Sequence, residues 1–226
     1  MPAPGRTTSQ TRADSRQAMP GARLVLNAGS GRDQPETLHP AFRRRPWRQV
    51  RLDIDPSVRP DIIASVTDLG GVVPDARFDA VWCSHILEHL YDHEVPRALM
   101  EFRRVLKPAG FALLTCPDLE KVAELVVAQD AETVAYMSSA GPISALDMLF
   151  GHGRSIARGN EFMAHRTSFT STRLGRLLLE TGFDEVRVAE GGNYDLWALA
   201  LMPKAKHAEV QACLEGTQQE FLLAKE

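Results

Sequence analysis

Short apolar runs separated by turn residues recur along the chain, and they predict a series of buried strands. The clearest run, residues 23–28, ends at Gly29-Ser30-Gly31, which is typical of a strand that enters a tight turn. Further strands are expected over residues 50–56, 61–64, 78–83 and 111–116, and in a closing hairpin around 186–188 and 196–201. Because strands and helical segments alternate, the pattern predicts an α/β fold: a Rossmann-like, doubly wound, mostly parallel sheet. The closing hairpin predicts one antiparallel strand at the edge of this sheet.

Helical spacing is strongest over residues 94–107, where apolar positions recur every three or four residues until Pro108 and Gly110 end the pattern. A second helix is expected over residues 171–181. The segment between the first two strands contains three prolines, Pro35, Pro40 and Pro46. Each proline removes a backbone donor, so a short or broken helix is expected there.

The chain has 226 residues, which suffice for one α/β domain with additions. Residues 1–21 are almost free of apolar side chains, so we expect a flexible N-terminal arm. The main domain is expected over 22–204, with an insertion at 130–168 that covers a binding site. Residues 205–226 are expected to form an amphipathic helix that packs on the domain. Its apolar face consists of Val210, Cys213, Leu214, Phe221 and Leu222.

The composition is that of an ordinary globular protein, with 44% hydrophobic residues, 24% charged residues and a net charge of −3. No apolar segment approaches the roughly 20 residues that cross a bilayer, and no secretory signal is visible. The three cysteines are far apart and lack metal-ligand spacing, which favours free thiols in a reducing compartment. We therefore expect a cytoplasmic protein, monomeric or homodimeric, without a membrane partner. The basic run of Arg43, Arg44, Arg45 and Arg48 is interpreted as a solvated face, so no nucleic acid partner is expected.

The turn after the first strand and an acid after the second together indicate an adenosine-type ligand. The glycines of Gly29-Ser30-Gly31 allow the backbone to approach a ligand closely. Asp53, 22 positions after Gly31, can accept hydrogen bonds from ribose hydroxyls. A dinucleotide would place its pyrophosphate near Asp33, which is an anion at the position of a third glycine. The cationic sulfonium of S-adenosylmethionine (SAM) tolerates an acid there, so SAM is favoured over NAD(P).

Three further segments carry a family resemblance. They are Phe78-Asp79-Ala80-Val81, Ser84-His85-Ile86-Leu87-Glu88-His89-Leu90 and Arg104-Val105-Leu106-Lys107-Pro108-Ala109-Gly110. In this combination the chain resembles the class I SAM-dependent methyltransferases of the type 11 kind. The resemblance runs from about residue 24 to 118, and more loosely to 203.

The resemblance implies a seven-stranded sheet and a defined cofactor pocket. The loop from Gly29 to Gly31 would meet the methionine part of SAM, and Asp53 would hold the ribose. The cofactor-binding residues expected from the motifs are Asn27, Gly29, Ser30, Gly31, Asp53, Ile54, Ser65, Val66 and Ser84. The chain departs from the family at three places: Asn27 stands where an acid is usual, Asp33 replaces a glycine, and Ser65 replaces an aspartate that contacts adenine.

The histidines that follow the fourth predicted strand allow two interpretations. His85, Glu88 and His89 also match the H-x-x-E-H zinc signature, in which two histidines bind the metal. That signature needs a long helix and a third ligand, whereas here it follows a buried strand, so no metal is expected and His89 is interpreted as structural. His85 and His165 are the candidate catalytic residues, because a hydroxyl or amine acceptor must lose a proton.

The sequence therefore predicts a SAM-dependent methyltransferase that acts on a small molecule or on a small group of a carrier. The fourth strand ends in Cys83-Ser84-His85-Ile86, without the Pro-Pro-aromatic pattern of enzymes that methylate base amines. Two alternatives stay open at this point: a non-catalytic, SAM-binding regulatory protein of the same fold, and an NAD(P)-binding reductase.

Overall fold

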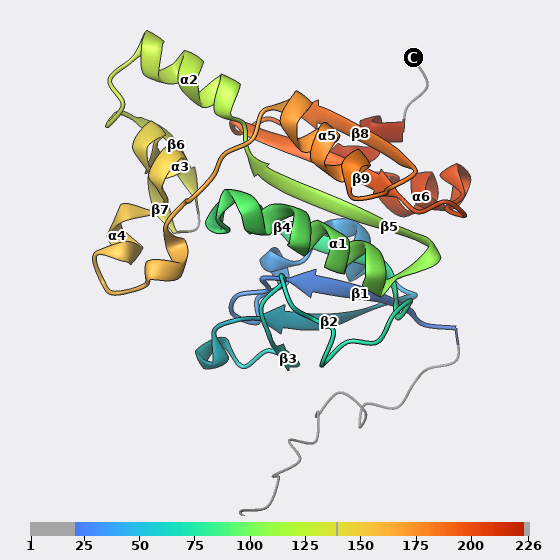
Figure 1. Cartoon of the computed structure of the whole chain (residues 1–226). Coiled ribbons are helices and arrows are strands. Elements are labelled where there is room, and N and C mark those ends of the chain that lie inside the picture. The colour runs from blue at the N-terminus through green and yellow to red at the C-terminus, as the bar shows by residue number, and fades with distance from the viewer. Residues whose placement is uncertain (1–20, 139, 224–226) are drawn as a thin grey trace, which may run out of the picture.

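The computed structural model describes residues 21–138 and 140–223, so residues 1–20 of the predicted arm lie outside the described part. Seven strands form one sheet in the order β3-β2-β1-β4-β5-β9-β8 (Figure 1). Every neighbouring pair from β3 to β5 is parallel, and β9 is antiparallel to both of its neighbours. The strands are β1 (Arg23–Ala28), β2 (Trp47–Asp53), β3 (Ile62–Ile63), β4 (Phe78–Ser84), β5 (Leu106–Pro117), β8 (Glu185–Glu190) and β9 (Asp195–Leu201).

The predicted Rossmann-like, mostly parallel sheet with a closing hairpin is confirmed, but one detail was wrong. The antiparallel strand β9 lies between β5 and β8, so the edge strand is β8. The reason is burial: Leu196 and all residues from Ala198 to Leu201 are buried, as suits a strand inside a sheet. Strand β8 carries Glu185 and Arg187 and has no fully buried residue, which suits an edge.

One face of the sheet is covered by two regular amphipathic helices, α1 (Val95–Val105) and α5 (Ser171–Glu180). Both lie in front of the sheet in Figure 1. Helix α1 buries Ala98, Leu99 and Phe102 against the strands, and these positions repeat at helical spacing. The two helices predicted from the sequence are confirmed.

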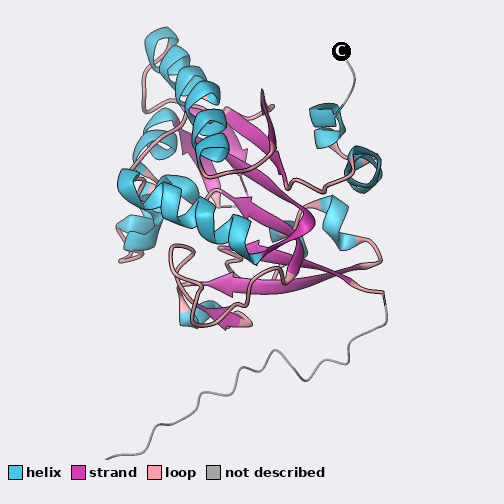
Figure 2. Cartoon of the chain, turned by 45° about the vertical axis from the view of Figure 1, so that its right-hand side comes forward, coloured by secondary structure: helices cyan, strands magenta, loops and turns pink. Residues whose placement is uncertain are grey.

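The opposite face is covered by short segments, so that helices lie on both sides of the sheet (Figure 2). Between β1 and β2 the prolines leave two 3₁₀ helices, η2 (Pro35–Thr37) and η3 (Pro40–Arg43), as the broken-helix prediction required. Phe42 of η3 is buried and stacks on Phe111, with ring centroids 6.0 Å apart. This aromatic contact anchors η3 on β5 in place of a regular crossover helix.

The C-terminal segment covers the same face, but it is not one continuous helix. It forms α6 (His207–Leu214) and the 3₁₀ helix η8 (Gln218–Leu223), separated at Gly216, whose φ is +70°. The left-handed conformation at Gly216 ends α6 and turns the chain. Consequently Phe221 does not share the buried face of Val210 and is 44% exposed.

After β5 the chain leaves the sheet and builds a separate lobe. Its elements are α2 (Leu119–Ala128), β6 (Val134–Ser138), β7 (Gly141–Ser144), α3 (Ala145–Phe150), α4 (Gly153–Ile156) and η7 (Glu161–Met163). Strands β6 and β7 form a two-stranded antiparallel sheet, and Val122, Ile143 and Met148 belong to a small apolar core of the lobe. In Figure 1 the β6–α4 part of the lobe lies at the left, where the arrowheads of β1 and β2 point. The lobe therefore stands at the carboxyl ends of the parallel strands.

In the part of the chain that the structure describes, no helix combines the length and the apolar character needed to cross a membrane. The three cysteines, Cys83, Cys116 and Cys213, are buried and free.

Candidate active site

A crevice of about 490 Å³ opens beside the carboxyl ends of β1, β2 and β4. This volume is within the range of small-molecule sites. Most residues that the sequence predicted for the site line it: Gly29, Gly31, Asp53, Ile54, Ser65, Val66, Ser84 and His85. Ligands of doubly wound sheets bind at this edge, so the crevice is the candidate active site.

The loop after β1 is fixed by backbone hydrogen bonds to β2. The amides of Gly29 and Ser30 donate to the carbonyl of Leu52 at 2.9 and 3.0 Å, and the Gly31 amide donates to Asp53 Oδ2 at 2.8 Å. Gly29 and Gly31 both have positive φ, +69° and +58°, which favours glycine at these turn positions. The backbone of the loop is therefore held at a defined distance from the Asp53 carboxylate.

The carboxylate of Asp53 organises the crevice wall at the end of β2. Its second oxygen, Oδ1, accepts a hydrogen bond from the Asp55 amide at 2.9 Å. An ionised carboxylate has about four acceptor sites, so two remain for a ligand. A buried neighbour, Arg51, donates to the carbonyls of Gly31 and Val58 and joins the two loops. Sequence reasoning missed this role of Arg51, because an arginine in a strand gives no signal of its partners.

Two predicted residues, Asn27 and Ser30, are buried at the end of β1 and do not line the crevice. Asn27 Nδ2 has no hydrogen-bond partner, which is costly for a buried donor. A Cβ at Gly31 would meet no atom within 4 Å, whereas the side chain of Ile86 covers Gly29. The open backbone at Gly31 and the free acceptor sites of the Asp53 carboxylate fit a polar ligand such as SAM.

His85 lies directly after β4 in a strained conformation, with φ at +51°. Its amide donates to the Thr115 carbonyl at 2.9 Å, and its imidazole lines the crevice. Nδ1 of His85 lies 3.1 Å from Oε1 of Glu88, which is buried in the 3₁₀ helix η5 (Leu87–His89). Partial loss of water around the ring opposes the charge on His85, but the Glu88 carboxylate raises the pKa of His85 above its ordinary value. Burial likewise opposes ionisation of Glu88, yet His85 and the nearby histidines lower its pKa.

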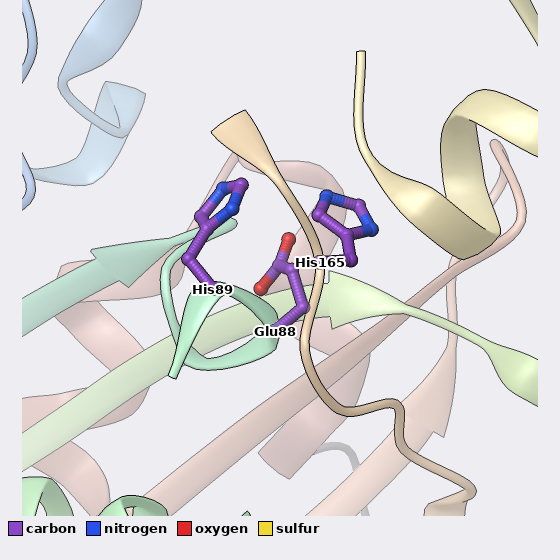
Figure 3. Close-up of side chains that lie close together, drawn as sticks. All are labelled: Glu88, His89 and His165. Carbon is purple, nitrogen blue, oxygen red and sulfur yellow. The ribbon is translucent and has the colours of Figure 1, made fainter. Parts of the chain in front are cut away.

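Two more imidazoles, those of His89 and His165, stand beside Glu88 (Figure 3). Their ring centroids lie 4.8 Å apart in a T-shaped arrangement. His89 Nδ1 donates to the Ala164 carbonyl at 3.1 Å, and His165 Nδ1 donates to the Met148 carbonyl at 2.8 Å. Burial lowers the pKa of His165, so the neutral imidazole is favoured. His89 lines the crevice, whereas the predicted catalytic residue His165 does not.

The insertion supplies the other wall of the crevice, through Asn160, Phe162, Met163 and Arg166. The Arg166 guanidinium lies 4.5 Å from the ring centroid of Tyr91, a further lining residue that follows η5. His152, also in the insertion, lines a separate small pocket instead. Motif spacing gives no signal for these wall residues, because their place depends on how the insertion folds back.

The H-x-x-E-H pattern lies in η5 and the residues before it, not on the long helix that the zinc-protease signature requires. Of the pattern's residues, Glu88 and His89 lie close to His165, and potential ligand atoms of these three side chains are within 4.8 Å of one another.

Comparison with known proteins agrees with this geometry. Residues 27–114 match the model of the methyltransferase domain family. A SAM-dependent methyltransferase from Archaeoglobus fulgidus superposes with a TM-score of 0.52 at 14% identity, over 80% of this chain and 86% of that one. The PH0226 protein from Pyrococcus horikoshii OT3 gives a TM-score of 0.53 at 16% identity, over 80% and 82%. No curated protein matches the sequence.

The chain thus shares its fold with these two solved structures, the first of which is a SAM-dependent methyltransferase. Residues 27–114 match the methyltransferase domain family, and this match supports a SAM-dependent methyltransferase activity. The resemblance stated from the motifs is confirmed, and the reductase alternative is set aside.

Proposed function

We propose that the crevice holds SAM between the loop after β1 and the loops after β2 and β3. The observation that carries this proposal is the pairing of Asp53 with the Gly31 amide at the crevice wall. Asp53 binds the ribose hydroxyls, and the backbone of Gly29 to Gly31 faces the methionine part. Ile54, Ser65 and Val66 line the adjacent wall and enclose the adenine. When bound, SAM supplies an electrophilic methyl group on its sulfonium.

The acceptor enters from the insertion side, and it is a small molecule or a small group on a carrier. Phe162, Met163 and Tyr91 give this side an apolar and aromatic character, and Arg166 adds one cation. A planar or apolar acceptor with an acidic substituent fits such a wall. The protein's contribution to the reaction is alignment of the acceptor with the methyl group.

His85 is the proposed general base for a hydroxyl or amine acceptor. Glu88 holds its Nδ1 hydrogen bond, which leaves the other ring nitrogen, Nε2, to accept a proton from the acceptor. About half of the His85 side chain is exposed, at 47%, so the imidazole is accessible from the crevice. The pair has the acid–histidine arrangement in which a carboxylate orients an imidazole base.

A titration and a turnover assay test the proposal together. Calorimetry with SAM should give one site per chain, and formation of S-adenosylhomocysteine over a panel of small acceptors should identify the substrate. With that substrate, His85→Gln should lower kcat by about 100-fold and leave the SAM dissociation constant unchanged. SAM binding without product from any acceptor would favour the regulatory alternative, and an unchanged kcat would exclude His85 as the base.

A further inference from the structure

Glu88, His89 and His165 form a cluster of which the proposed methyl transfer uses only Glu88, through its hydrogen bond to His85. One potential ligand atom from each residue lies within 4.8 Å of the others. In Figure 3 the Glu88 carboxylate lies between the two imidazole rings. From this juxtaposition we propose that the three side chains bind a divalent transition-metal ion at the wall of the crevice.

The unpaired oxygen of Glu88 is the first argument. Glu88 is 1% exposed, and its Oε1 is bonded to His85. Its Oε2 has no hydrogen-bond partner. A buried carboxylate oxygen without a partner costs free energy, and a coordinated cation removes that cost.

The second argument is how the two histidines are held. Both donate Nδ1–H to a backbone carbonyl, of Ala164 and of Met148. A carbonyl only accepts, so the donated proton must be on Nδ1, and each Nε2 keeps an unshared pair when the ring is neutral. Metal-binding histidines show this arrangement, because the second bond fixes both the tautomer and the ring orientation.

The donor set defines the class of ion. Two imidazoles and one carboxylate suit Zn²⁺, Co²⁺, Ni²⁺ or Fe²⁺, whereas Mg²⁺ and Ca²⁺ prefer oxygen ligands. Ligands of a tetrahedral Zn²⁺ lie roughly 3.4 Å apart, so the three ligand atoms, which lie within 4.8 Å of one another, have to move closer together around an ion. Three protein ligands leave a coordination position open. Because His89 lines the crevice, a bound ion would lie next to the space proposed for the acceptor.

Metal binding by the full chain tests the site directly. The chelator-treated protein should bind one Co²⁺ with visible absorption bands, and one Zn²⁺ should displace it while Mg²⁺ does not. His89→Asn and His165→Asn remove Nε2 but keep a donor near the position of Nδ1, and Glu88→Gln removes the charge. Each variant should bind Zn²⁺ at least tenfold more weakly than the unchanged chain, as measured by competition with a chromogenic chelator. His207→Asn, at an exposed histidine outside the cluster, is the matched control and should bind as the unchanged chain does.

Thermal unfolding separates loss of the ligand from loss of the fold. Zn²⁺ should raise the Tm of the unchanged chain and of His207→Asn, and should raise it less in the cluster variants. If Glu88→Gln does not fold, the two histidine variants decide the question. Absence of stoichiometric binding, or equal affinity in all variants, would overturn the metal site. Neither result bears on the cofactor proposal, because SAM calorimetry is done on the metal-free protein.

Discussion

On one side of the crevice, the loop after β1 is fixed by bonds to a single neighbouring strand. On the other side, His89 is fixed by a carbonyl 75 residues away, at Ala164. The first side is a local consequence of two strand ends, Gly29 to Gly31 and Asp53. The second exists only when the insertion folds back onto η5. Binding of SAM at the proposed cofactor side and of the substrate at the proposed acceptor side should therefore respond separately to substitution.

The largest effect is expected at Asp53. Asp53→Ala removes the proposed ribose acceptor and the bond from the Gly31 amide, so SAM should bind about 100-fold more weakly. Calorimetry measures the change, with the exposed Asp184→Ala as the matched control. If Asp53→Ala binds SAM like the control, the ribose assignment is wrong.

A substitution in the insertion should break the acceptor side alone. A Cβ at Gly151 would lie 1.9 Å from the Met163 carbonyl oxygen, and φ there is +95°. Gly151→Ala should increase local opening of the insertion, seen by hydrogen exchange, at least about tenfold more than Gly159→Ala. Gly159 also has positive φ, at +91°, but a Cβ there meets no atom within 4 Å. If Gly151→Ala also weakens SAM binding relative to Gly159→Ala, the two sides are coupled.

A smaller change at the crevice wall should affect the acceptor only. Phe162 lines the crevice, whereas Phe150, another exposed phenylalanine of the insertion, does not. Phe162→Ala should raise the KM of the acceptor about fivefold, because an aromatic contact is lost, and Phe150→Ala should leave it unchanged. The SAM dissociation constant should be the same in both variants. A rise in KM with Phe150→Ala would place the acceptor elsewhere on the insertion.

Outside the crevice, pH should change the stability of the whole domain only slightly. Burial lowers the pKa of His39, whose ring bonds to Gln219 and holds η8 on the sheet. Below its ordinary pKa of about 6.5 the unfolded chain takes up a proton that the folded chain resists. The free energy of unfolding should therefore fall as the pH drops from 6.5 towards the lowered pKa. His39→Gln should flatten that dependence in urea unfolding, and an unchanged profile would assign it to other groups.

The difference between the two sides of the crevice also explains which parts of the site could be predicted from the sequence. The run 23–28, the glycines after it and Asp53 are neighbours through adjacent parallel strands, so periodicity and motif spacing were enough to place them together. The role of His89 could not be read in this way, because its partners come from the insertion. The position of β9 inside the sheet was missed for a similar reason. A hairpin pattern predicts which strands pair, but not which of them meets β5.

The carbonyl of Glu88 receives the amides of Arg166 and Thr167, at 2.7 and 3.3 Å. These two hydrogen bonds to one oxygen mark the point at which the insertion returns to the main domain. Segments of other lengths could replace residues 130–163 as interchangeable modules, provided that the chain comes back to the same carbonyl. Chimeras joined there would differ in acceptor preference and keep the proposed SAM site unchanged.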